Sequence, residues 1–111
     1  MARTSMTYVG ALRGEGLLIG SADGCEFGRA QYDIGGFINH TKTVVASGEL
    51  RMHPESLKRA FGRADLVLQT DTGMNLGVRF SGKLLAGGSA AAHVDVTEGL
   101  PTQADWPAAP E

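Results

Sequence analysis

Apolar and polar residues alternate along much of this chain, and a period of two predicts β-strands that bury one face. Over residues 74–80 the apolar residues are all even-numbered, and the odd-numbered residues are polar or glycine. The same alternation recurs over residues 43–50 and 90–97. Strands are therefore expected at residues 8–12, 17–19, 25–34, 43–50, 66–68, 74–80 and 90–97.

Sequences that favour tight turns separate these stretches. Asp23-Gly24 and Thr72-Gly73 each lie between two predicted strands, and glycine supplies the positive φ angle that tight hairpin turns need. Within residues 25–34 the apolar positions change from odd to even numbers at Gly28-Arg29, where we expect a β-bulge. The strands should therefore form antiparallel hairpins.

One segment, residues 54–61, has the spacing of a short helix. Leu57 and Phe61 share one apolar face, and Pro54 suits the first helical position because its missing N–H is not needed there. Gly62 is a suitable residue to end the helix. A helix of about two turns must be held by packing of its apolar face, because it is too short to be stable alone.

The two halves of the chain resemble each other at a spacing of 49 residues. At this offset Gly24 coincides with Gly73, and so do the glycines four residues later. Residues 15–51 and 64–98 then each form a three-stranded meander. Any two hairpins with glycine turns share such features, so chance similarity is the alternative.

Two such meanders cannot each bury an apolar face alone, whereas together they can. We therefore predict an all-β fold, a small antiparallel barrel of six or seven strands with pseudo-twofold symmetry. The short helix would bridge the two halves.

Length and composition fit a single domain. The 111 residues leave no room for two domains of ordinary size, and 42% apolar residues are enough to form a core. We expect one barrel domain over residues 1–98 and a flexible, proline-rich tail over residues 99–111. The expected core residues are Val44, Leu50, Leu57, Phe61, Leu76, Val78, Phe80 and Val94.

Net charge and cysteine content restrict the partners and the compartment. A net charge of −2 is too small to favour nucleic acid or a membrane surface. No apolar stretch approaches the ~20 residues of a membrane helix, and no secretory signal follows the amino end. The single Cys25 cannot form an internal disulfide, so we expect a reduced thiol in the cytoplasm.

Residues that could support catalysis or metal binding are few. His40, His53 and His93 are far apart in the sequence, and no HExxH or CxxC motif accompanies them, so we expect neither metal nor cofactor. Nothing beside Cys25 favours a reactive thiolate, because its neighbour Asp23 is acidic. No catalytic residue is predicted. An enzyme is the third alternative, which a pocket shared by Cys25 and His40 or His93 would support.

A mild excess of basic residues is the one positive sign of a binding site. Residues 51–83 carry six basic residues against three acidic ones. Arg59 and Arg63, one helical turn apart, are spaced to bind one phosphate or carboxylate together. The alternative is solvated charge that complements the helix dipole. The candidate contact residues in this region are Lys58, Arg59, Arg63 and Arg79.

Trp106 completes the set of candidate contact residues. It is the only Trp of the chain and lies in the proline-rich tail, where a large apolar side chain is unusual. Three arrangements stay open, because the ring could dock on its own barrel, dock on a neighbouring molecule or remain in solvent.

Arg59 and Arg63 also have the R-x-x-x-R form found in PilZ domains, which are small six-stranded barrels that bind cyclic di-GMP. In that family the arginine motif precedes the first barrel strands, and a D/N-x-S-x-x-G motif follows it. Here the arginines lie in the middle of the chain, and residues 71–76 lack both the Ser and the Gly of the second motif. The chain is therefore not assigned to this family.

These features favour a non-enzymatic binding or protein-interaction module of the kind found in the bacterial cytoplasm. Its partner would be a protein or an anionic small molecule bound at the mild basic patch, and a homodimer is left open. The alternative is a barrel that encloses a small molecule or nucleotide, because small inward residues either leave a cavity or let strands approach closely. Those small residues are Ala46, Gly48, Ala90 and Ala92.

Overall fold

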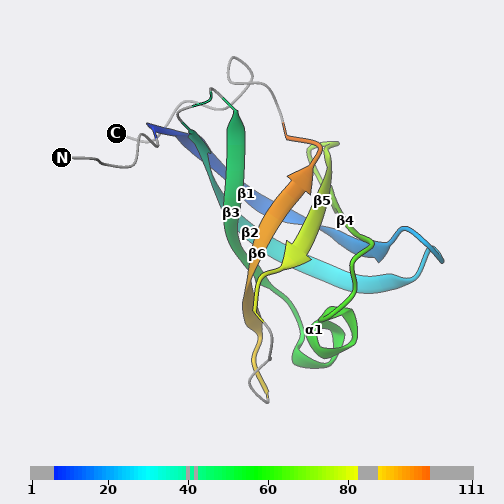
Figure 1. Cartoon of the computed structure of the whole chain (residues 1–111). Coiled ribbons are helices and arrows are strands. Elements are labelled where there is room, and N and C mark those ends of the chain that lie inside the picture. Colours follow the sequence, from blue (N-terminus) through cyan, green and yellow to red (C-terminus); the bar gives the residue numbers. More distant parts are fainter. Residues whose placement is uncertain (1–6, 40, 42, 83–87, 101–111) are drawn as a thin grey trace.

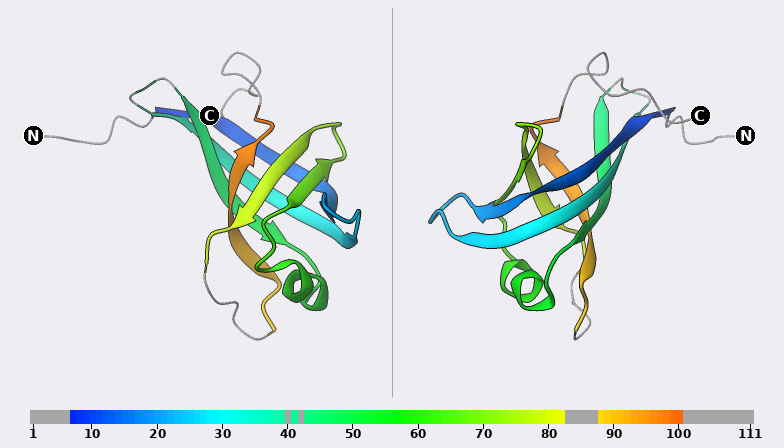
Figure 2. Two further views of the ribbon diagram at one scale, coloured as in Figure 1. Left: turned by 45° about the vertical axis from the view of Figure 1, so that its right-hand side comes forward. Right: turned by 180° about the vertical axis from the view of Figure 1, so that it is seen from behind.

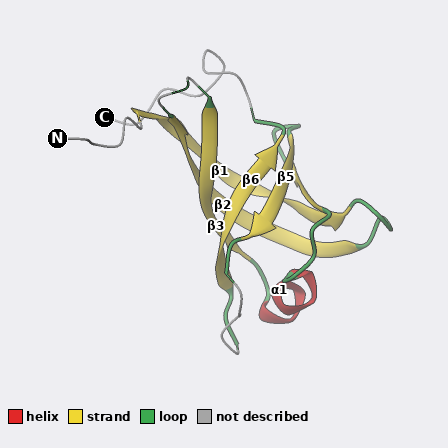
Figure 3. Ribbon diagram, viewed as in Figure 1, coloured by secondary structure: helices red, strands yellow, loops and turns green. Residues whose placement is uncertain are grey.

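Six strands form a closed antiparallel barrel in the computed structural model, which describes residues 7–39, 41, 43–82 and 88–100 (Figure 1). The elements are β1 (Thr7–Gly20), β2 (Glu26–Ile38), β3 (Val44–Arg51), α1 (Pro54–Ala60), β4 (Leu66–Thr70), β5 (Asn75–Phe80) and β6 (Ala91–Glu98). Around the barrel the strands follow the order β1-β2-β3-β6-β5-β4. The predicted all-β barrel with one short helix is confirmed (Figure 3).

The barrel contains six strands and not seven. The strands expected at residues 8–12 and 17–19 are parts of one continuous strand, β1. The polar residues between them stay extended because each pairs with a residue of β2, as Arg13 does with Asp33 and Glu15 with Gln31. Cross-strand pairing therefore overrides the local break in alternation.

Each half of the barrel is a three-stranded meander, and α1 connects the two. Strands β1, β2 and β3 pair in sequence, as do β4, β5 and β6. The halves join where β1 pairs with β4 and where β3 pairs with β6. The two hairpins differ in size, because β1 has 14 residues and β4 has five.

The two hairpin turns also differ in length, which affects the predicted repeat. The Gly20 N–H bonds to the Cys25 carbonyl in the first turn, whereas the Thr70 N–H bonds to the Met74 carbonyl in the second, one residue closer. At the offset that aligns the turn glycines, the preceding strands are out of step by one residue, so inward Leu18 meets an outward residue. Superposition of the halves residue by residue stays a prediction.

The change of alternation within β2 coincides with an irregularity of pairing. The register shifts by one residue at Phe27, which lies between the residues that pair with Leu18 and Ile19. As a result, Phe27 and Ala30 are both buried although their numbers differ in parity. The predicted bulge is confirmed, and it begins one residue before Gly28.

Every strand contributes to one apolar core. Six of the eight predicted core residues belong to it, and Val44 and Phe61 are half-buried and pack against it. The largest fully buried side chains are Leu18, Ile34, Leu50, Leu57, Leu68, Leu76, Val78 and Val94. Alternation along the sequence therefore identified the inward faces of the strands.

The helix α1 lies across one end of the barrel (Figure 2). His53 caps its amino end, where the ring Nδ1 accepts a hydrogen bond from the Glu55 N–H at 3.2 Å. Leu57 and Ala60 are fully buried, so the helix docks through its predicted apolar face. It is one residue shorter than predicted because the residue after Ala60 is already extended.

Candidate functional site

Two of the predicted site residues meet on one aromatic ring at the barrel end that α1 covers. The guanidinium carbon of Arg59 lies 5.6 Å from the ring centre of Phe27, and that of Arg63 lies 5.1 Å from it. Phe27 itself is buried at the bulge of β2. The face of an aromatic ring attracts a guanidinium, so this ring helps to position both arginines.

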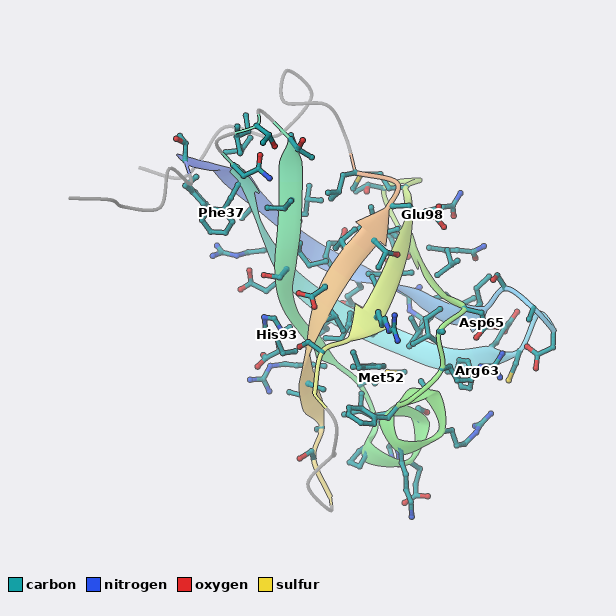
Figure 4. All side chains as sticks on the ribbon, in the orientation of Figure 1. Phe37, Met52, Arg63, Asp65, His93 and Glu98 are labelled. Atoms are coloured by element: carbon teal, nitrogen blue, oxygen red, sulfur yellow. The ribbon has the colours of Figure 1, made fainter. Side chains whose placement is uncertain are left out.

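Arg63 already has two carboxylate partners. Its Nε donates to Asp65 Oδ1 at 2.8 Å, and its Nη2 donates to Asp65 Oδ2 at 2.6 Å and to Asp23 Oδ1 at 3.0 Å. The Arg63 and Asp65 side chains are only 28% and 23% exposed, and Figure 4 shows them together beside the connection that follows α1. Arg63 therefore fastens the end of α1 to the β1–β2 turn.

These contacts hold the partners in their charged forms. Hydrogen bonds from Arg63, followed by one from the Ala22 N–H, keep the pKa of Asp65 well below its usual range. The pKa of Asp23 is also lowered, first by Arg63 and then by the Cys25 N–H. Hydrogen bonds to Asp65 and then to Asp23 raise the pKa of Arg63. One guanidinium facing two carboxylates offers little attraction to a further anion.

Arg59 differs from Arg63 because no carboxylate pairs with it among the described residues. Its Nη2 contacts Sγ of the half-buried Cys25 at 3.8 Å. Glu55 lies one helical turn earlier but forms no ion pair with Arg59. Both Arg59 and the preceding Lys58 are exposed, so these two residues form the part of the predicted basic patch that is accessible on α1.

The two remaining predicted site residues are not part of this cluster. Arg79 is exposed on β5 and lies directly opposite Asp95 of β6 in the strand register, but among the described residues no ion pair joins the two side chains. In the described residues, no hydrogen bond, ion pair or aromatic contact connects Arg79 to α1. Trp106 lies outside the described residues.

Two adjoining depressions cross the outer face of β1, β2 and β3. Their volumes are about 480 Å³ and about 350 Å³, and Gln31 lines both. None of the five predicted site residues lines either one. Charged residues of both signs line the larger depression, namely Arg13, Glu15, Asp33, Glu49 and Arg51. Ion pairs on the outer face occupy both of these arginines, so the depression presents no net positive charge.

The barrel is not paired along its whole length, which the sequence analysis did not predict. Strand β1 pairs with β2 from Thr7 to Ile19, but with β4 only from Gly16 to Gly20. In the described part of the chain, nothing pairs with the other side of residues 7–14, here called the free edge. Figure 2 shows the amino-terminal half of β1 extending beyond β4. The shortness of the predicted strand at β4 was the one sequence signal for this feature.

An apolar surface lies beside the free edge. The rings of Tyr8 and Phe37 pack edge to face with centres 5.4 Å apart, and both reach over the bare backbone of Gly35. Tyr8 is 44% exposed, and Val45, which pairs with Phe37, is half-buried. This barrel end therefore exposes part of an aromatic ring to solvent.

At Gly48, one of the small residues predicted to face inward, the small size serves close packing of two strands. A Cβ atom on Gly48 would collide with the Asp33 carbonyl oxygen and come within 2.7 Å of Ile34 Cα. Gly48 therefore lets β2 and β3 approach closely, which supports packing over a ligand cavity at this position. Ala90 was expected to face inward, but it precedes β6 and is exposed.

The side chains of Cys25 and His93 have separate contacts in the described residues. The Oγ of Ser81 lies 2.6 Å from His93 Nδ1 on the exposed surface, whereas the side chain of Cys25 contacts Arg59. Within the part of the chain that the structure describes, no group of three or more His, Cys, Asp or Glu side chains could hold a metal ion. His40 lies outside it.

Comparison with known proteins finds no family model, curated protein or solved structure that matches this chain. Among residues 7–39, 41, 43–82 and 88–100, no helix is long and apolar enough to cross a membrane. Function is therefore inferred from the surfaces of the barrel alone.

Proposed function

We propose that this protein is a non-enzymatic binding module that takes an anionic partner at Lys58 and Arg59. The observation that carries the proposal is the exposed guanidinium of Arg59, which has no carboxylate partner among the described residues. Carboxylates occupy most of the other described arginines, namely Arg13, Arg29, Arg51 and Arg63.

The surroundings of Arg59 favour anion binding because they position its side chain without neutralising it. The Phe27 ring lies beneath the guanidinium, and Cys25 Sγ lies beside it. A positioned guanidinium loses little side-chain entropy on binding, and it can donate two parallel hydrogen bonds to a phosphate or carboxylate. Lys58 adds a second positive charge.

Arg63 has a different role in this proposal from the one that the sequence spacing suggested. Its hydrogen-bonding groups are directed to Asp23 and Asp65, so it holds the helix end and the ring of Phe27 in place. The anion would therefore meet one free arginine and one lysine, and not a pair of arginines.

A thermal-shift screen against nucleotides, cyclic dinucleotides and inorganic pyrophosphate tests this proposal. An anion present at 100 times its Kd should raise the free energy of unfolding by about 2.7 kcal/mol. Arg59→Gln should abolish the shift and leave the melting temperature of the free protein nearly unchanged. Arg79→Gln, which removes an exposed arginine from β5, is the matched control and should retain the shift.

Two outcomes would contradict the proposal. If Arg79→Gln reduces the shift as much as Arg59→Gln, the effect reflects net charge and not a site. If none of the anions stabilises the protein, Arg59 is a surface charge without this function.

A further inference from the structure

We infer that the free edge of β1 binds a second copy of this chain, so that two β1 strands pair antiparallel and join two barrels into one sheet. The inference goes beyond the proposed function, because the free edge and Arg59 lie on different parts of the barrel and neither needs the other.

The backbone groups of Ala11 and Arg13 point towards the free edge. In a strand, the N–H and C=O of one residue point to one side, and those of the next residue point to the other. The Glu15 carbonyl accepts a hydrogen bond from the Asp71 N–H at 2.9 Å, and Asp71 follows β4. Pairing with β2 is regular from Gly10 to Glu15, so the groups of Arg13 and Ala11 point to this same side.

No strand of the described residues meets these groups. The ladder between β1 and β4 starts at Gly16 and does not extend towards the amino end of β1. There, Arg13 and Gly14 are exposed and Ala11 is half-buried. Backbone groups at such an edge form a template for another strand. The free edge therefore offers the N–H and C=O groups of two residues, Ala11 and Arg13, which are two positions apart.

A second β1 strand can bond to all of these groups. If the twofold axis passes through Leu12, Ala11 of one copy lies opposite Arg13 of the second copy, and the reverse pair forms on the other side of the axis. Each copy then donates both free N–H groups and accepts with both free carbonyls. Because the same surface is used on both copies, the contact is closed and stops at a dimer.

The side chains along the free edge do not oppose such pairing. Residues 7–12 contain no charged residue and no proline, which are the usual means of protecting an edge strand. Arg13 carries the one charge of the free edge, and Asp33 pairs with it at 3.0 Å. The edges of two copies therefore meet without strong charge repulsion.

The aromatic pair beside the free edge, exposed Tyr8 and half-buried Phe37, gives this contact an apolar component. Tyr8 and Phe37 lie on the outer face next to the first residues of β1. Aromatic side chains are enriched in protein interfaces, and Tyr8 is 44% exposed in the single chain. A neighbouring barrel would cover part of this ring.

Sedimentation analysis over a range of protein concentration tests the dimer. The wild type should shift from a mass of 11.6 kDa to twice that mass as concentration rises. Ala11→Pro removes an N–H from the free edge without breaking a bond to β2, and it should weaken dimerisation at least tenfold. Ala11→Val keeps the N–H and is the matched control. Arg59→Gln should dimerise as the wild type does.

Hydrogen exchange of the wild type gives a second readout that needs no variant, in case Ala11→Pro fails to fold. The amides of Ala11 and Arg13 should become protected as concentration rises, whereas those of Gly10 and Leu12, which face β2, should be protected throughout.

Three results would overturn the inference. They are a wild type that stays monomeric at all concentrations, a dimer that persists in folded Ala11→Pro, and protection of Ala11 and Arg13 at every concentration. The last result would show that another segment of the same chain covers the free edge.

Discussion

The two ends of the barrel carry similar aromatic pairs in opposite settings. At the end covered by α1, the rings of Phe61 and Phe80 lie 5.2 Å apart, and Phe80 is 7% exposed. At the other end the rings of Tyr8 and Phe37 lie 5.4 Å apart, and Tyr8 is 44% exposed. At the helix end Phe61, the residue directly after α1, packs against the core with Phe80, whereas at the other end much of the Tyr8 ring contacts water.

The ion pairs of the two ends differ in the same way. The side chains of Arg63 and Asp65 beside α1 are 28% and 23% exposed, whereas those of Arg13 and Asp33 beside the free edge are 64% and 61% exposed. Exposed pairs contribute little because water screens them. Stability should therefore reside at the helix end, and the free-edge end should be available for contacts.

The largest expected effect comes from truncating the covered aromatic pair. Phe80→Ala should lower the free energy of unfolding by roughly 3–5 kcal/mol, because it removes a buried ring and leaves a cavity against Phe61. Urea denaturation monitored by circular dichroism measures the change. A loss below about 1 kcal/mol would contradict the assignment of this ring to the core.

Between the two ends, Gly48 tests how closely the barrel wall is packed. Gly48→Ala should cost roughly 1–3 kcal/mol, because the new methyl group meets the Asp33 carbonyl and the strands must separate. Ser47→Ala, at the adjacent half-buried position, is the matched control and should cost less in the same urea titration. If Gly48→Ala is neutral, there is spare room beside β3, and a barrel that encloses a ligand gains support.

The sequence predicted the fold well because burial in a strand is a local property. The even numbers of Leu76, Val78 and Phe80 were enough to place them on the inner face, and all three are buried. The continuity of β1 could not be predicted in the same way. Its polar central residues, such as Arg13, are held extended by pairing with β2. This pairing cannot be predicted from the local pattern of apolar and polar residues.

The candidate site was predictable only in part. Arg59 and Arg63 do come together over Phe27, but not through the predicted helical turn, because α1 ends at Ala60 and Arg63 lies beyond it. The spacing gave no sign that Arg63 would bind Asp23, because that carboxylate is 40 residues away and arrives through the β1–β2 turn. For the free edge the only sign in the sequence was the shortness of the strand at β4, because the edge depends on where β4 ends relative to β1.

The half-buried ion pair at the helix end should make part of the stability pH-dependent. Asp65→Asn should lower the melting temperature at pH 7 by roughly 5 °C, because it removes the partner that holds Arg63 in place. Asp65 has a lowered pKa in the folded protein, so its contribution is full above the unfolded value of about 3.9. It is lost as pH falls below that value towards the folded one.

Melting curves from pH 7 to pH 3 measure this contribution. The difference between the wild type and Asp65→Asn should shrink as the pH falls. Asp33→Asn removes a carboxylate from the exposed pair with Arg13 and should change the melting temperature by less than about 2 °C at pH 7. Equal losses from Asp33→Asn and Asp65→Asn would mean that the two ends of the barrel do not differ in this respect.

The smallest effect on stability is expected from the exposed aromatic pair. Tyr8→Ser should lower the free energy of unfolding by less than about 1 kcal/mol, because much of the ring contacts water in the folded chain and little burial is lost. The free energy of unfolding should be measured at low protein concentration, because association of the folded protein would add stability that rises with concentration. A loss above about 2 kcal/mol under these conditions would show that Tyr8 and Phe37 stabilise the fold as Phe61 and Phe80 do. The free-edge end would then be part of the folded core, and it would no longer be a surface left available for a partner.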